Sequence, residues 1–112
     1  MIPIDPAVPR AEAAWFGLRA YLEARMQAIG AEVRGYPTPI AACDVQLSEL
    51  IERRDRALER LKAMRSAGRD DARERLDAMD AFLAGPPAFA GDRAEERLRD
   101  RLCAALHGMI RG

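Results

Sequence analysis

The residues best suited to chemistry in this chain are two cysteines and one histidine. Cys103 and His107 are four positions apart, so on a helix they share one face, as two metal ligands can. A closed metal site needs about four ligands, and the sequence has no second histidine to complete one. Cys43 lies near an expected helix start, where a thiol can become reactive, but it falls in an apolar stripe and has no Cys-x-x-Cys partner. We therefore expect no metal site, no cofactor and no cysteine catalysis.

A second candidate for chemistry is the charged run over residues 49–56 and the basic residues near it. The main interpretation is a solvated helix face whose acids and bases pair along the helix. The alternative is an arginine-lined cleft between helices that binds a small carboxylate or phosphate through Arg53, Arg54 and Lys62. An arginine-rich stretch from Arg53 to Arg75 could contact a phosphate backbone, but it is interrupted by acids and lacks interleaved aromatic residues, so weak nucleic-acid binding is a third hypothesis and not the expected one.

Residues 50–58, with the sequence LIERRDRAL, are similar to the first-helix pattern of the helical class of chorismate mutases. The resemblance covers one helix. It implies a small all-helical enzyme that rearranges a dicarboxylate in an arginine-lined cleft, with Lys62 in the place of the lysine that such sites commonly use. The chain has no glycine-rich phosphate loop, no paired serine and histidine nucleophile, and no acid–base carboxylate motif. A protein without chemistry of its own is therefore the main hypothesis, and the enzyme is its alternative.

The composition indicates an all-α protein. The chain has 112 residues, which predicts one domain over 1–112 with a modest core. Hydrophobic residues make up 49% and aromatic residues 5%, and much of the apolar content is alanine. Alanine, leucine, arginine and glutamate dominate and are good helix formers, whereas β-branched residues are scarce.

Charge and segment composition narrow the partners and the location. The formal net charge is zero and all basic residues but Lys62 are arginine, so the clustered basic excess of a nucleic-acid binder is missing. No apolar run approaches the roughly 20 residues of a membrane span, and the start of the chain does not resemble a signal peptide. Two cysteines do not make a disulfide framework. We expect a cytoplasmic protein with no membrane partner.

Helix signals divide the chain into four helices, two long and two short, after an extended proline-rich lead-in over 1–8. Thr38 before Pro39 is the clearest start signal, since threonine can cap a helix and proline suits its first position. Asp70 or Asp71 opens the third helix, and Asp92 with Glu95 resembles a capping box for the fourth. With glycine and proline stops, the predicted helices cover 9–33, 39–65, 70–84 and 92–110.

These lengths predict an antiparallel bundle that forms a dimer. At 1.5 Å per residue the two long helices span about 35–40 Å and the third about 20 Å, so the short helices leave part of the long hairpin bare. A second copy of the chain, or a related helical protein, would cover it. Phe89 is expected to plug the end of the core. The function predicted from this is protein–protein interaction, as an adaptor, regulator or structural accessory. The residues expected on the interaction surface are Tyr36, Pro37, Ile40, Leu47, Arg54, Leu58 and Leu61.

Overall fold

A computed structural model describes residues 7–36, 41–66 and 71–111 of the chain. They form four helices, α1 (Ala7–Arg34), α2 (Ala41–Ser66), α3 (Ala72–Ala84) and α4 (Arg93–Arg111), and no strand occurs among them. The prediction of an all-helical fold is confirmed. Each helix begins and ends within about two residues of its predicted range, which is the usual uncertainty of a helix boundary. The predicted start at Pro39 lies outside the described residues.

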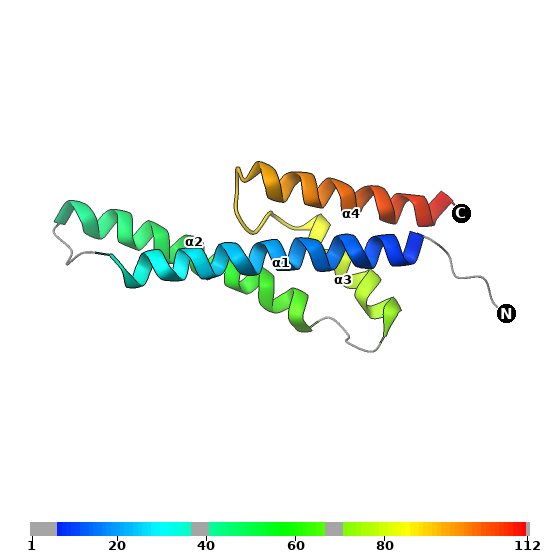
Figure 1. Cartoon of the computed structure of the whole chain (residues 1–112), viewed down its shortest axis with the longest axis horizontal. Coiled ribbons are helices and arrows are strands. Elements are labelled where there is room, and N and C mark those ends of the chain that lie inside the picture. The colour runs from blue at the N-terminus through cyan, green and yellow to red at the C-terminus, as the bar shows by residue number, and fades with distance from the viewer. Residues whose placement is uncertain (1–6, 37–40, 67–70, 112) are drawn as a thin grey trace.

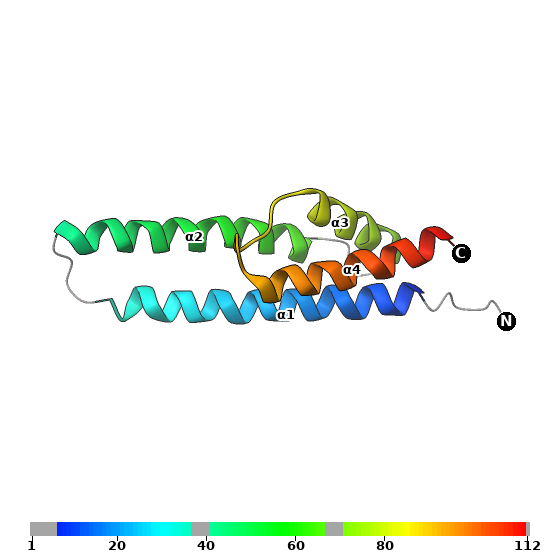
Figure 2. The same ribbon diagram turned by 90° about the horizontal axis from the view of Figure 1, so that it is seen from above.

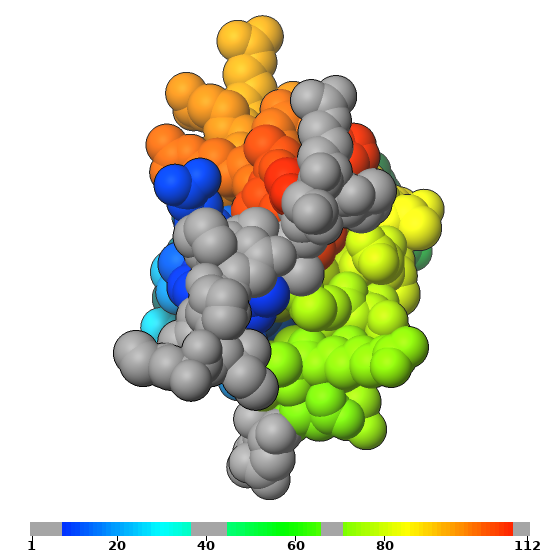
Figure 3. Space-filling model, turned by 90° about the vertical axis from the view of Figure 1, so that its right-hand side faces the viewer, coloured from blue at the N-terminus to red at the C-terminus, as the bar shows by residue number. Residues whose placement is uncertain are grey.

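The helices build a short bundle from which a two-helix hairpin projects. α1 runs along the whole molecule, and α2 returns beside the half of α1 that ends at Arg34 (Figures 1 and 2). α4 packs along the other half of α1, and α3 lies beyond the end of α2, beginning near the end where α1 begins and running back toward the middle of the molecule (Figure 2). Figure 3 looks onto that end, where the start of α1, α3 and the end of α4 come together. The half of the hairpin where α1 ends and α2 begins is covered by neither α3 nor α4 (Figures 1 and 2).

The core lies where α1 meets the other three helices. Trp15 of α1 and Phe82 of α3 pack edge to face, with ring centroids 5.8 Å apart, a favourable geometry for two aromatic rings. Phe89, from the segment between α3 and α4, is buried against the same cluster, as expected. The rest of the core consists of large apolar side chains that recur along the helices. They are Leu18, Leu22 and Ile29 on α1, Leu61 and Met64 on α2, Met79 on α3, and Leu102 and Leu106 on α4.

Aspartates begin the two short helices, as the sequence predicts. Asp71 accepts a hydrogen bond from the backbone N–H of Arg73, at 2.9 Å, and so caps α3. Asp92 accepts the N–H groups of Ala94 and Glu95 and caps α4. The capping box itself is wrong, because the Glu95 side chain does not turn back to the cap. It points into the protein instead, for a reason that the next subsection describes.

Candidate functional site

Helix α2 has an inward face and two flanks, and the candidate sites lie on the flanks. The inward face carries Ala57, Leu61 and Met64, all buried in the core cluster. Leu61 is fully buried, so its predicted place on the interaction surface needs correction. In a helix, each residue turns about 100°, and Leu61 therefore lies with the core residues instead of the outer stripe. The burial of Leu61 holds α2 in the bundle.

The first flank of α2 is an apolar stripe formed by Leu47, Ile51 and Leu58, which we call the outer stripe. All three are partly exposed, and none belongs to the described side chains that pack against the buried core, whereas Leu50 does. Arg54 lies between them at the same helical spacing, and its guanidinium forms an ion pair with the neighbouring Asp55, at 3.5 Å. With Arg54 counted as part of it, the outer stripe includes three of the residues predicted for an interaction surface, Leu47, Arg54 and Leu58, with Ile51 in addition.

The tip of the hairpin is only partly described. The Tyr36 hydroxyl donates a hydrogen bond of 3.0 Å to the side-chain oxygen of Gln46, which ties the end of α1 to the start of α2. This bond gives Tyr36 a role within the chain. Pro37 and Ile40, the other predicted tip residues, lie outside the described residues.

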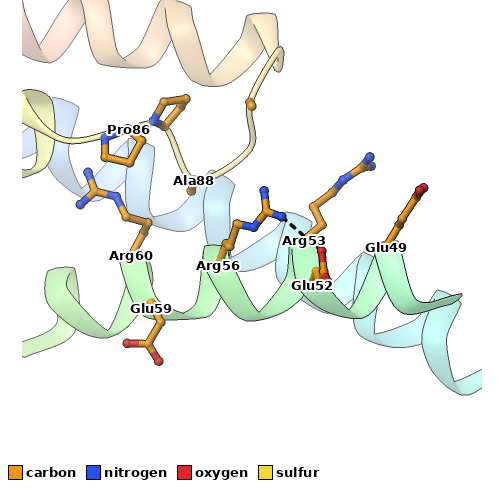
Figure 4. Close-up of a pocket in the computed structure, with 10 residues that line it drawn as sticks. Glu49, Glu52, Arg53, Arg56, Glu59, Arg60, Pro86 and Ala88 are labelled. Carbon is orange, nitrogen blue, oxygen red and sulfur yellow. Dashed lines mark hydrogen bonds and ion pairs between the residues drawn. The ribbon is translucent and has the colours of Figure 1, made fainter. Parts of the chain in front are cut away.

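The second flank of α2 faces a groove of about 590 Å³, between the helix and residues 86–90 (Figure 4). Arg53, Arg56 and Arg60 line it together with three glutamates, and prolines and alanines form the opposite wall. Arg56 is held by Glu52 at 3.3 Å, while Arg53 extends away from that pair (Figure 4). Of the three predicted ligand-binding residues, only Arg53 reaches this groove.

Arg54 and Lys62 lie on other faces of α2. Arg54 belongs to the outer stripe, and Lys62 pairs with Glu59 at 3.5 Å on an exposed part of the helix. The three residues therefore do not form the cleft that the resemblance to chorismate mutases implies, because positions 53, 54 and 62 point in different directions around a helix.

Two arginines bond the carboxyl end of α3, from which residues 86–90 of the groove wall continue. Arg60 donates a hydrogen bond of 2.6 Å to the backbone oxygen of Phe82 and lies over the Phe82 ring, 4.3 Å from its centre. Arg99 of α4 donates to the backbone oxygens of Leu83 and Gly85, at 3.2 and 3.1 Å. Positive charge is favoured at the carboxyl end of a helix. Burial, and then the nearby Arg99, lower the pKa of Arg60, yet arginine keeps its charge at neutral pH.

Glu95 of α4 holds the part of the groove wall at residues 88–89. This buried role is not among the predictions from the sequence. Glu95 is fully buried, and its two carboxylate oxygens accept the backbone N–H groups of Ala88 and Phe89, each at 2.7 Å. Charged acceptors make short, strong hydrogen bonds of this kind. A signal for this was present, because Glu95 lies three and seven residues before Leu98 and Leu102 and so occupies an inward position of α4.

A smaller concavity of about 440 Å³ adjoins the groove, between α1, α2 and the start of α4. Asp92 organises it. Its Oδ2 accepts a hydrogen bond of 2.7 Å from the Tyr21 hydroxyl and lies 3.4 Å from Nε of Arg25. Burial alone would raise the pKa of Asp92, but the hydrogen bonds from Tyr21 and from the N–H groups of α4, with the charge of Arg25, lower it. The bond to Asp92 is the main reason that the pKa of Tyr21 is raised.

The cysteines and the histidine form no site among the described side chains. Cys103 is partly buried and His107 is exposed, and the described residues contain no group of three or more histidine, cysteine, aspartate or glutamate residues that could hold a metal ion. The side chain of Cys43 lies outside the described part of the chain. Of the helices described, none is long and apolar enough to cross a membrane.

Comparison with protein-family models, with curated proteins and with solved structures finds no match to this chain.

Proposed function

We propose that this chain is a cytoplasmic helical protein that acts through protein–protein interaction, and that it pairs with a second copy of itself through the outer stripe. One observation carries the proposal. Leu47, Ile51 and Leu58 form an apolar flank of α2, interrupted by Arg54, that remains partly exposed and does not pack against the core. Apolar side chains that recur along one exposed helix face are typical of a surface that a second helix covers.

The order of residues in the outer stripe suits a symmetric pair. When two copies of α2 cross antiparallel about a two-fold axis between Glu52 and Arg53, Leu47 faces Leu58 of the partner subunit, and Leu58 faces Leu47 of the partner subunit. Ile51 then lies opposite Arg54 of the partner subunit, whose methylene groups can cover it. A two-fold interface uses the same patch on both copies, so this self-matching order is what it requires.

The size of the stripe predicts a weak dimer. Full burial of a leucine or isoleucine side chain contributes about 1.5–3 kcal/mol, and these residues are already partly buried. Six such side chains, taken at the lower end of that range at about 1.5–2 kcal/mol each, oppose an association cost of at least about 4 kcal/mol. The net corresponds to a dissociation constant between about one and a few hundred micromolar, with exchange between monomer and dimer at ordinary protein concentrations.

Sedimentation velocity between about 1 and 500 μM tests the proposal, since this range brackets a micromolar constant. We expect the wild type to shift from monomer to dimer, and Leu47→Asp with Leu58→Asp to remain monomeric. Val45→Asp is the matched control, because Val45 is 60% exposed on another face of α2. The control should dimerise like the wild type. A wild type that stays monomeric throughout, or a control that is as impaired as the stripe variant, would contradict the proposal. Circular dichroism of each variant checks that the fold is kept.

A further inference from the structure

Three arginines from three different helices line the concavity between α1, α2 and the start of α4. They are Arg25 of α1, Arg53 of α2 and Arg93 of α4, and residues 89–92 complete the wall. One acid, Asp92, lines it as well. Like charges that converge on one concavity repel each other unless an anion lies between them. The excess of two positive charges stands out in a chain whose formal net charge is zero.

Asp92 cannot neutralise the two outer arginines, because its bonds are already made. Its Oδ1 accepts the N–H groups of Ala94 and Glu95, and its Oδ2 accepts the Tyr21 hydroxyl and lies beside Arg25. Arg25 is fixed further by the ring of Phe89, 5.0 Å away. The floor of the concavity is therefore preorganised, and its single carboxylate is already bonded within the chain.

The two outer arginines are free to meet a ligand. Neither Arg53 nor Arg93 forms an ion pair or a side-chain hydrogen bond with any residue that the structure describes. Arg93 is also the first residue of α4, where the helix dipole disfavours a positive side chain and favours an anion. Its position is therefore unfavourable for the stability of α4 itself and suits an anion held at that end.

The backbone of residues 90–91 adds donors to the same wall. Ala90 and Gly91 both line the concavity, and their N–H groups make no hydrogen bond within the described part of the chain. Gly91 has a φ of 82°, a conformation that glycine adopts readily and other residues adopt at a cost. Gly91 has no side chain to block access to its backbone N–H group, a feature of many anion sites.

We infer that this concavity binds the phosphate group of a small phosphate monoester. Guanidinium groups from three directions, with backbone N–H donors, match the several oxygens of a tetrahedral phosphate better than the two oxygens of a planar carboxylate. The volume of about 440 Å³ is that of a small-molecule site. The phosphate lies between Arg53 and Arg93, with Arg25 beneath it. This site is independent of the proposed dimer, since it occupies the other flank of α2.

Isothermal titration calorimetry at low salt, with inorganic phosphate, glycerol 3-phosphate and succinate as probes, tests the inference. We expect both phosphate probes to bind with dissociation constants below about 1 mM, and succinate to bind more weakly. Arg53→Gln with Arg93→Gln should weaken phosphate binding at least about tenfold, as expected when charged hydrogen-bond donors are lost. Arg73→Gln is the control for the charge change, because Arg73 is exposed on α3 and outside the concavity. It should leave the affinity unchanged.

A two-dimensional ¹H–¹⁵N spectrum locates the bound probe. Phosphate should move the amide signals of Ala90, Gly91 and Arg93 most, and the double variant should lose those shifts while its other signals stay in place. The inference is overturned if neither phosphate probe binds with a dissociation constant below about 1 mM, if succinate binds as tightly as phosphate, or if the control loses as much affinity as the double variant. Shifts centred elsewhere in the chain would overturn it equally.

Discussion

Replacement of Glu95 is the most direct test of how residues 86–90 are held against α2. Glu95 is fully buried and accepts two backbone N–H groups at 2.7 Å, from Ala88 and Phe89. A hydrogen bond to a charged group contributes about 1.5–3 kcal/mol, and an orphaned buried donor costs about 1–3 kcal/mol. Glu95→Ala leaves both donors without a partner and opens a cavity, so we expect a loss of about 3–5 kcal/mol in the free energy of unfolding.

Glu95→Gln separates the chemistry from the volume, because glutamine has nearly the same shape. Its amide oxygen can keep one of the two N–H groups, but its NH₂ group must face the other. We expect this variant to lose about 2 kcal/mol. Glu96→Gln is the control, since Glu96 is the exposed neighbour of Glu95 on α4 and its substitution removes the same charge. Its effect should stay within about 0.5 kcal/mol.

Urea unfolding followed by circular dichroism at 222 nm measures these differences, with the slope of each transition compared between variants. A domain of this size has a total stability of about 5–15 kcal/mol, so the loss expected for Glu95→Ala is a large fraction of it. The reasoning is refuted if Glu95→Gln is as stable as Glu96→Gln. That result would mean that the two N–H groups find other partners and that Glu95 does not hold the wall.

Two further predictions concern the groups around this wall. The lowered pKa of Asp92 means that its carboxylate stabilises the fold above the ordinary value of 3.8, and that this contribution is lost as the pH falls through the lower pKa of the folded state. Wild type should therefore lose more stability between pH 6 and pH 3 than Asp92→Asn, in urea unfolding at both pH values; an equal loss would contradict the assignment. The second prediction concerns Gly85, whose added Cβ would lie 2.9 Å from the guanidinium nitrogens of Arg60, which is held by Phe82. Gly85→Ala should cost about 1 kcal/mol in wild type and close to nothing with Arg60→Ala, in a double-mutant cycle; an additive result would show that the two positions are not coupled.

The helices could be predicted from the sequence because their signals are local. Apolar residues at a helical spacing, from Trp15 to Ile29 on α1 for example, identify both a helix and the face that it buries. Asp71 and Asp92 precede their helices as capping residues do, and both act as caps in the structure. Composition adds to these signals, because good helix formers dominate the chain.

The sites could not be predicted in the same way, because they depend on contacts between distant segments. The groove forms only when residues 86–90 fold back over α2, more than 25 positions earlier in the chain. The Tyr21–Asp92 hydrogen bond joins residues 71 positions apart. Proximity in sequence groups Arg53, Arg54 and Lys62, whereas the helix turns them to different faces. The spacing of Glu95 from Asp92 fits a capping box, but the inward register of Glu95 with Leu98 is the stronger signal.

The two proposals can be tested separately, because the proposed dimer surface and the proposed phosphate site lie on different faces of α2. The inward face, with Ala57 and Leu61, fixes α2 in the bundle. The outer stripe and Arg53 lie on opposite flanks of that face, so a helix that covers Leu58 leaves the concavity around Arg53 open. A monomeric variant of the outer stripe should then bind phosphate as the wild type does, and an Arg53→Gln variant should dimerise normally. If loss of the dimer also abolished phosphate binding, the phosphate site would have to include residues of both copies, and the placement of the two sites on separate flanks would be wrong.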